Sequence, residues 1–278
     1  MKTLYVSDMD GTLLGSDSRV SAETAGIISE LSLRGALITV ATARTPATVV
    51  PLLADTYTCA EAIVMTGAAT YSRSKKCYET VHYMPEADVA SGLEICRRQG
   101  VHPFVYSMRA DSTMLDVYHG AAAMNKAEEN FYLERKHLKL KAFHTGTPLP
   151  PAAIGRTVLF FAMGVRRGVE LTAEMLRRDT NLAVCCYPDI FNPDIANLEV
   201  FAPGVSKAAA ISALKKKLGA DRLVVFGDNL NDLSMLEAAD VAVAVENAFP
   251  EVNAKADIII GPNYADSVAR FIAADFAG

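Results

Sequence analysis

Short apolar runs alternate with longer amphipathic stretches over the first part of the chain. Residues 3–7 form a run of β-favouring side chains that ends at a polar turn, and residues 36–41 and 62–65 are two further runs of this kind. Between the first two, residues 21–34 place apolar side chains at helical spacing, and Gly35 ends that stretch. Apolar runs that alternate with helices are typical of parallel strands covered on both faces. The pattern therefore predicts an α/β fold with a doubly wound, mostly parallel sheet.

The pattern changes in the middle of the chain, where shorter strands and polar helices replace the regular alternation. This change predicts an inserted α+β domain over residues 84–188 with a small sheet of its own. The proline-bounded segment 188–193 is typical of a linker, and the run 197–201 (NLEVF) that follows it is expected to resume the first sheet. The predicted domains are therefore a core made of residues 1–83 and 189–278, and the insertion between them.

Composition narrows the class of protein. The 278 residues are 51% hydrophobic and 21% charged, which is a globular mix and excludes a disordered chain. The 27 basic and 32 acidic residues give a net charge of −5, which argues against nucleic acid or an anionic membrane as a partner. No apolar run approaches the roughly 18 residues of a membrane span. The five cysteines show no metal-like spacing, and no secretory signal is apparent, so a cytoplasmic protein is expected.

Polar side chains follow the predicted core strands at the points where those strands end. In open parallel sheets, ligands bind at the edge formed by the carboxyl ends of the strands. The residues expected at this edge, or at the starts of the helices that follow it, are Asp8, Asp10, Thr42, Lys207, Asp228, Asn231 and Asp232. Carboxylates gathered at one edge repel one another unless a cation compensates them. Oxygen ligands without His or Cys favour Mg²⁺ over zinc, so we expect a magnesium site suited to phosphoryl transfer.

Asp8 and Asp10 are separated by one residue after the first strand. In an extended chain, residues two apart point to one side and lie about 6–7 Å from each other. The two carboxylates can therefore flank a single phosphoryl group. Gly11 follows them and permits a tight turn with close approach of the backbone.

Four segments resemble, in order, the four motifs of the haloacid dehalogenase-like superfamily. They are residues 8–13 (DMDGTL), 41–44 (ATAR), 204–207 (GVSK) and 227–232 (GDNLND). The position of the insertion is similar to that of the large α/β cap in the Cof-type sugar-phosphate phosphatases of this superfamily. The resemblance implies a Rossmann-like core with an inserted cap domain. It also implies an Mg²⁺-dependent phosphatase that acts on a small phosphorylated metabolite, with sugar phosphates as the first expectation.

The resemblance also implies roles for individual residues. Asp8 would be the nucleophile that forms an aspartyl-phosphate, and Asp10 would be the general acid and then the general base. Thr42, Ala43, Lys207 and Asn231 would bind or orient the phosphoryl group. The metal would be held by Asp8, Asp10 (through its carbonyl), Asp228 and Asp232, the last either as a ligand or through a water on the metal. The family commonly has Gly at position 43 and Asn at position 66, where this chain has Ala43 and Thr66, so the backbone fit around the substrate stays open.

Other functions use similar residues. A phosphomutase of the same fold would use Asp8 and Asp10 in the same way and would transfer phosphate without releasing it. A signalling receiver domain also combines Asp, Mg²⁺, Thr and Lys, but it accepts phosphate after its third strand and has no large insertion. A dehalogenase needs no second acid at position 10, and an inactive binding protein needs none of these groups. The sequence does not indicate an oligomeric state.

One basic segment lies outside these motifs. Residues 134–141 contain five Lys, Arg or His side chains among eight residues. A solvated helix face is the simplest interpretation of such a segment. A surface of the insertion that contacts phosphate esters is the alternative.

Overall fold

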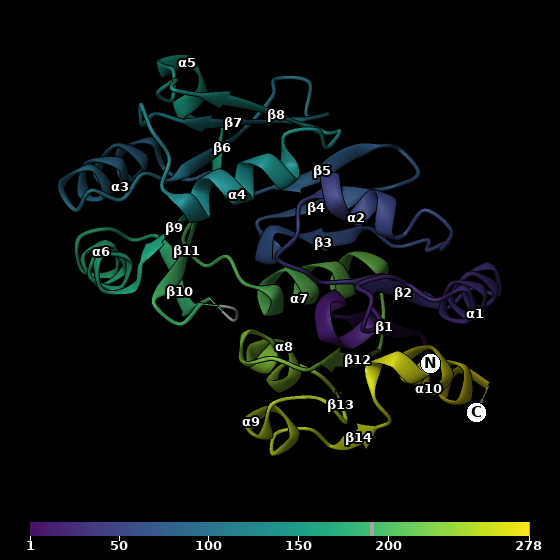
Figure 1. Ribbon diagram of the computed structural model, residues 1–278. Coiled ribbons are helices and arrows are strands. Elements are labelled where there is room, and N and C mark those ends of the chain that lie inside the picture. The colour runs from purple at the N-terminus through teal and green to yellow at the C-terminus, as the bar shows by residue number, and fades with distance from the viewer. Residues whose placement is uncertain (190–191, 278) are drawn as a thin grey trace. The chain divides into compact units, whose positions relative to one another are not determined.

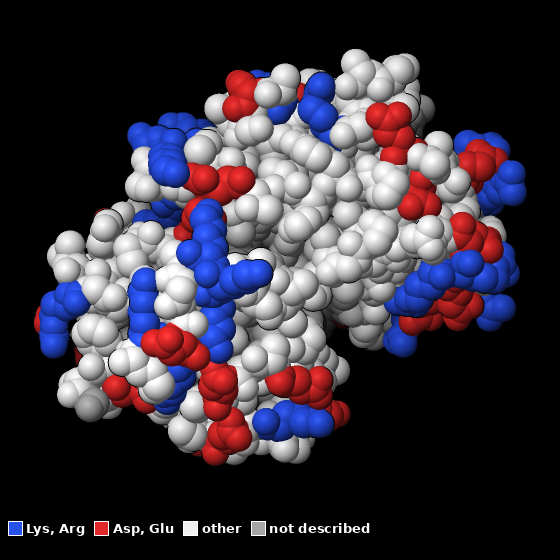
Figure 2. Space-filling view, turned by 180° about the vertical axis from the view of Figure 1, so that it is seen from behind, with Lys and Arg blue, Asp and Glu red and all other residues white. Residues whose placement is uncertain are grey.

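The computed structural model describes residues 1–189 and 192–277. The chain forms two compact units. The core unit contains Met1–Thr80 and the residues from Ser206 onward, and the inserted unit contains Val81–Val205. In the described residues, no helix is both long and apolar enough to cross a membrane. On the face shown in Figure 2, basic side chains lie among acidic ones.

A five-stranded parallel sheet forms the centre of the core unit. Its order is β14–β13–β12–β1–β2, and every neighbouring pair is parallel. The strands are β1 (Thr3–Ser7), β2 (Leu37–Val40), β12 (Arg222–Gly227), β13 (Val241–Val245) and β14 (Ile258–Ile260). Strand β1 is an interior strand between β12 and β2, and its Leu4, Tyr5 and Val6 are buried, as expected for a strand that is covered on both faces. The two parts of the chain that form the core unit therefore meet where β1 pairs with β12.

Helices cover both faces of this sheet (Figure 1). On one face, Leu4 and Val6 of β1 share an apolar cluster with Ile211 and Leu214 of α7. The other face is covered by α1 and α10, which lie side by side. The core helices are α1 (Ala22–Leu33), α2 (Pro46–Leu52), α7 (Lys207–Leu218), α8 (Leu233–Glu237), α9 (Pro250–Asn253) and α10 (Ser267–Ala277). This arrangement confirms the predicted fold class.

A small antiparallel sheet extends the core unit beyond β2. It consists of β3 (Ala62–Val64), β4 (Ala69–Ser72) and β5 (Cys77–Val81) in that order. A parallel bridge between Ala41 and Ile63 joins it to the end of β2. The run at 62–65 was expected as a strand, whereas β4 and β5 were not, because their alternating polar residues carry a weaker signal than an unbroken apolar run.

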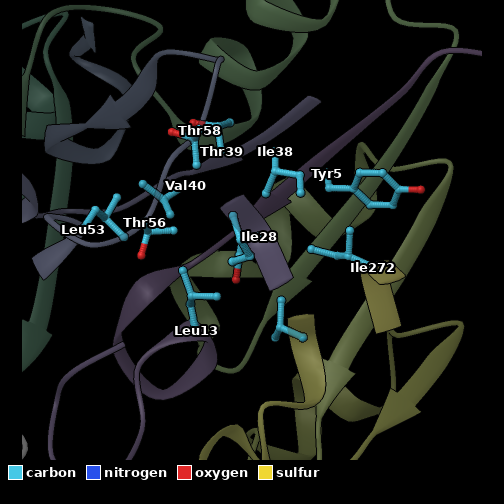
Figure 3. Close-up of a pocket in the computed structure, with 12 residues that line it drawn as sticks. Tyr5, Leu13, Ile28, Ile38, Thr39, Val40, Leu53, Thr56, Thr58 and Ile272 are labelled. Atoms are coloured by element: carbon cyan, nitrogen blue, oxygen red, sulfur yellow. The ribbon is translucent and has the colours of Figure 1, made fainter. Parts of the chain in front are cut away.

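A cavity of about 10 Å³ lies on the face of the core sheet that α1 and α10 cover, between these helices and strands β1 and β2 (Figure 3). Seven of its twelve lining residues are apolar, among them Ile28, Val40 and Ile272, and the other five carry hydroxyl groups. The buried hydroxyl of Thr56 is also there and has no hydrogen-bond partner among the described residues. The cavity is a packing defect with room for about one water molecule.

The inserted unit contains a six-stranded mixed sheet of order β10–β11–β9–β6–β7–β8. Its strands are β6 (Phe104–Met108), β7 (Leu115–His119), β8 (Lys141–Thr145), β9 (Thr157–Val165), β10 (Ala183–Pro188) and β11 (Ile195–Phe201). Helices α3 (Glu86–Arg98) and α6 (Arg166–Asp179) pack on the face that carries Val105, Phe160 and Leu198. Helix α4 (Lys126–Arg135) packs on the opposite face, where its Phe131 contacts Phe104 and Phe161, and α5 (Pro151–Ile154) is a single turn.

The expected position of the run 197–201 was wrong. This run lies in β11, which pairs antiparallel with β9 and with β10, so it belongs to the sheet of the inserted unit. The chain returns to the core unit only after Val205, later than the predicted linker at 188–193, of which Ile190 and Phe191 lie outside the described residues. Hydrophobic pattern identifies a strand, but pairing partners distant in the chain decide which sheet the strand joins.

Candidate active site

Two adjacent parallel strands bring the first carboxylates together. Asp8 follows β1, and its backbone N–H donates to the carbonyl of Phe226 in β12 (2.9 Å). Asp228 follows the end of β12. Because β1 and β12 are parallel neighbours with Ser7 opposite Phe226, their carboxyl ends place Asp8 and Asp228 side by side. The predicted gathering of strand-end carboxylates thus occurs for this pair.

Asp232 joins them from the turn after β12. Its Oδ2 accepts the backbone N–H groups of Asp228 and Asn229, each at 3.1 Å, so the turn is closed around the carboxylate. Gly227 allows this closure because a Cβ there would lie 2.7 Å from the Cβ of Asp232. Oxygen atoms of Asp8, Asp228 and Asp232 all lie within 4.8 Å of one another, and all three residues are buried.

Lys207 provides the positive charge of this cluster. It begins α7 and is 1% exposed, and its Nζ donates to Asp8 Oδ1 at 2.6 Å and to Asp232 Oδ1 at 2.7 Å. Burial by itself lowers the pKa of Lys207, but Asp8 and Asp232 raise that pKa by more than burial lowers it. The net shift is upward, so the ammonium form is favoured.

The carboxylates still outnumber this single cation. Burial, opposed by Lys207 and reinforced by Asp232, raises the pKa of Asp8 to about 7. Burial also raises the pKa of Asp228 to about 6, although a hydrogen bond from the Thr12 hydroxyl to its Oδ1 at 2.7 Å acts in the opposite direction. A second cation would relieve both shifts. The donor set is entirely oxygen, which fits Mg²⁺ and does not favour zinc.

Gly11 brings the backbone against the cluster. Its φ is +77°, and a Cβ at this position would clash with Asp228 Oδ2. The side chain of Asn247 donates to the Gly11 carbonyl at 2.8 Å and supports the turn. The expected close approach of the backbone is therefore present, and only glycine fits both the conformation and the space.

The structure places Asp10 differently from Asp8. The Asp10 carboxylate accepts two hydrogen bonds from Arg44, from Nε to Oδ2 at 2.7 Å and from Nη2 to Oδ1 at 2.6 Å. Its side chain is 53% exposed and is not part of the cluster formed by Asp8, Asp228 and Asp232. The carboxylate predicted to face the phosphoryl group is thus bound to a guanidinium in this structure.

The remaining predicted residues lie at the same end of the sheet. Thr42 is buried, and its Oγ1 accepts the backbone N–H of Arg44 at 3.2 Å, while Ala43 is half-buried. Asn231 is exposed in the turn that contains Asp232. The backbone of Thr66 is left-handed, with a φ of +56°, which suits the family's Asn better than a β-branched residue. The binding roles of Thr42, Ala43 and Asn231 remain predictions.

Three contributors to the site received no role from the sequence. Arg44 and Thr12 lie within two of the four motif segments. The sequence analysis identified those segments, but it did not predict the hydrogen bonds that these side chains form. Asn247 lies outside every motif, and no sequence signal pointed to it. Their partners are distant in the chain, and spacing alone does not reveal such contacts.

Comparison with known proteins gives consistent matches. The profile of the haloacid dehalogenase-like hydrolases matches residues 5–272. A 5-amino-6-(5-phospho-D-ribitylamino)uracil phosphatase of Bacillus subtilis is 27% identical over 275 residues, which cover 97% of this chain and 94% of that protein. A pyridoxal phosphate phosphatase of Escherichia coli is 56% identical over 52 residues, 19% of each chain. A haloacid dehalogenase-like hydrolase from Bacteroides thetaiotaomicron has the same fold, with a TM-score of 0.74, 21% identity and coverage of 99% and 100% of the two chains.

Proposed function

We propose that this chain, which belongs to the haloacid dehalogenase-like hydrolases as its four motifs predicted, is a phosphatase that hydrolyses small phosphomonoesters with Mg²⁺. We expect sugar phosphates among its substrates and an aspartyl-phosphate on Asp8 as the intermediate. The observation that carries this proposal is the buried cluster in which Lys207 joins the nucleophile Asp8 to Asp232.

In the first step, a carboxylate oxygen of Asp8 attacks phosphorus, and the bond between phosphorus and the ester oxygen breaks. Lys207 contacts Oδ1 of Asp8, so Oδ2 is the atom that we assign to the attack. The ammonium holds the carboxylate in one orientation and offsets charge on the transferring group. The departing alkoxide takes a proton from Asp10, and in the second step Asp10 accepts a proton from the water that hydrolyses the aspartyl-phosphate.

The Arg44 pair affects how Asp10 performs this role. Both carboxylate oxygens of Asp10 accept hydrogen bonds from the guanidinium. When Asp10 is protonated, one of its carboxyl oxygens carries the proton and only the other remains a good acceptor. Delivery of that proton therefore requires that one of the two hydrogen bonds from Arg44 opens. We therefore assign Arg44 as a positioning residue that holds Asp10 until substrate is bound.

Asp8, Asp228 and Asp232 are the side chains that would hold Mg²⁺. When bound, the ion supplies positive charge beside the phosphoryl oxygens. Thr12 and Gly11 support this site indirectly, because the first donates to Asp228 and the second leaves room for it.

The names of two relatives support small phosphomonoesters as the substrate class. One acts on a phosphoribityl compound and the other on pyridoxal phosphate, as their names state. We propose a substrate of similar size for this chain.

The test is release of inorganic phosphate from a panel of sugar phosphates and aryl phosphates, with Mg²⁺ and after chelation. We expect activity only with the metal, and Asp8→Asn should reduce turnover by at least about 10³-fold because a carboxamide is a poor nucleophile. The control is Asp55→Asn, which changes an exposed carboxylate outside the site. Full activity after chelation, or phosphoenzyme formation in Asp8→Asn, would contradict the proposal. Transfer between sugar phosphates without free phosphate would indicate a phosphomutase instead.

A second variant separates the two roles of Asp10. Sugar alkoxides need a proton to leave, so Asp10→Asn should slow their hydrolysis by about 10²–10⁴-fold. An aryl phosphate leaves as a stabilised phenolate, so the variant should release one equivalent of phenol rapidly and then turn over slowly. Equal losses on both substrates without a burst would show that Asp10 does not act as the acid and base.

A further inference from the structure

The basic segment 134–141 of the inserted unit does not form a uniform solvated face. Lys136, His137 and Lys139 are exposed, as the simplest interpretation predicted. Lys141, the first residue of β8, is instead only 5% exposed. The segment therefore contains one lysine whose burial a solvated face does not explain.

Lys141 lies next to a second cation on the sheet face that α4 covers. Its Nζ is 5.3 Å from the ring centre of Phe143 and 5.9 Å from that of Phe131. The guanidinium of Arg135, at the end of α4, stacks on Phe131 with its Cζ 4.4 Å from the ring centre. Two cationic groups therefore share one aromatic ring, and Phe104 packs against that ring to complete an apolar floor.

Two carboxylates, Glu134 and Glu199, lie near Arg135, and the second is buried and, like Arg135, acts on the Tyr106 hydroxyl. Among the described residues, no carboxylate forms an ion pair with Lys141. Arg135 pairs with its neighbour Glu134 at 2.6 Å, but that carboxylate is 68% exposed. An exposed pair of this kind is weakly bound and readily replaced. Lys141 is thus the cation of this pair that has capacity for an additional anion.

Electrostatics support the same conclusion. Burial, with a smaller contribution from Arg135, lowers the pKa of Lys141 to about 7. A charged amine without a carboxylate is costly in such a place, and aromatic faces compensate it only in part. Tyr106 of β6 is buried near Arg135 and Glu199 and offers a hydroxyl; burial and the Glu199 carboxylate raise its pKa, against Arg135, so that it remains neutral. An apolar side chain would fill the position of Lys141 at lower electrostatic cost.

We propose that Arg135 and Lys141 form a binding site for a small oxyanion, a carboxylate or phosphate group, on the inserted unit. Guanidinium and ammonium groups above an apolar floor suit a compact anion that is partly removed from water. The anion is a separate small ion that binds to the inserted unit, so this proposal does not rest on the proposed function.

The test measures thermal unfolding in EDTA with low-millimolar sulfate and with chloride at equal ionic strength. The wild type should be stabilised by sulfate over chloride, and Lys139→Met, which changes an exposed lysine of the same segment, should keep that stabilisation. Lys141→Met should lose it, and Arg135→Gln should lose it as well and provides a second variant if Lys141→Met fails to fold. If sulfate does not stabilise the wild type, or if both variants keep the stabilisation, Lys141 has a packing role only and the proposal is wrong.

Discussion

Lys207 is the residue whose removal should reveal most about the buried cluster. Lys207→Met keeps an unbranched side chain of similar length and removes the charge. It leaves Asp8, Asp228 and Asp232 within 4.8 Å of one another without their described ammonium partner. Removal of one partner from a buried ion pair typically costs about 3–5 kcal/mol in the free energy of unfolding. We expect a loss of this size at pH 8 in the absence of metal.

The loss should depend on pH, and the sign follows from the pKa of Asp8. Because that pKa is raised from 3.8 to about 7, the folded state binds a proton more tightly than the unfolded state. The contribution of Asp8 to the stability of the metal-free protein therefore falls as the pH rises from about 4 to about 7. Without Lys207 the carboxylates remain protonated to a higher pH. The cost of Lys207→Met should then be about 1 kcal/mol at pH 5 and should grow toward pH 8.

The assay is urea denaturation in EDTA at pH 5, 7 and 8, followed by circular dichroism because the chain has no tryptophan. Lys217→Met is the matched control, since Lys217 lies in the same helix and forms an exposed ion pair with Glu61. We expect the control to cost less than about 1 kcal/mol at every pH. Equal losses for the two variants at pH 8, or a loss for Lys207→Met that does not increase with pH, would refute this account of the cluster.

Three further outcomes are expected. Gly11→Ala should weaken Mg²⁺ binding and destabilise the core by about 2 kcal/mol or more, because its Cβ would collide with Asp228. Gly219→Ala, also left-handed but with no atom within 4 Å of its Cβ, should leave Mg²⁺ affinity measured by calorimetry unchanged. Thr56→Val should raise the urea midpoint by the equivalent of about 1 kcal/mol, since it removes a buried hydroxyl without a described partner; a lowered midpoint would show that the hydroxyl is satisfied. Mg²⁺ affinity should rise between pH 5.5 and about 7.5, by up to tenfold per pH unit for each displaced proton, because the pKa of Asp8 is about 7 and its proton competes with the metal; a flat affinity profile would contradict this.

The sequence alone was sufficient to predict the core of the fold and those site residues that directly follow the ends of strands. The unbroken apolar runs of β1 and β12 predicted buried parallel strands, and such strands align their carboxyl ends. Asp8 and Asp228 follow those ends directly, so their proximity is a consequence of the parallel register. Lys207 was also predictable as a helix start within a motif, although its two ion pairs were not.

Only the tertiary structure decided the features that depend on partners distant in the chain. The run in β11 has the same local pattern whether it joins one sheet or the other, and its pairing with β9 and β10 places it in the inserted unit. The carboxylate of Asp10 is two residues from Asp8, yet it turns to Arg44 because a guanidinium with matching geometry lies 34 residues further along the chain. Lys141 belongs to a basic segment in which Lys136, His137 and Lys139 are exposed, and it is buried because β8 forms an edge of a sheet that the aromatic residues of α4 cover. Local periodicity reports which face of an element is apolar, whereas the identity of the group that meets each face is set by contacts between segments far apart in the chain.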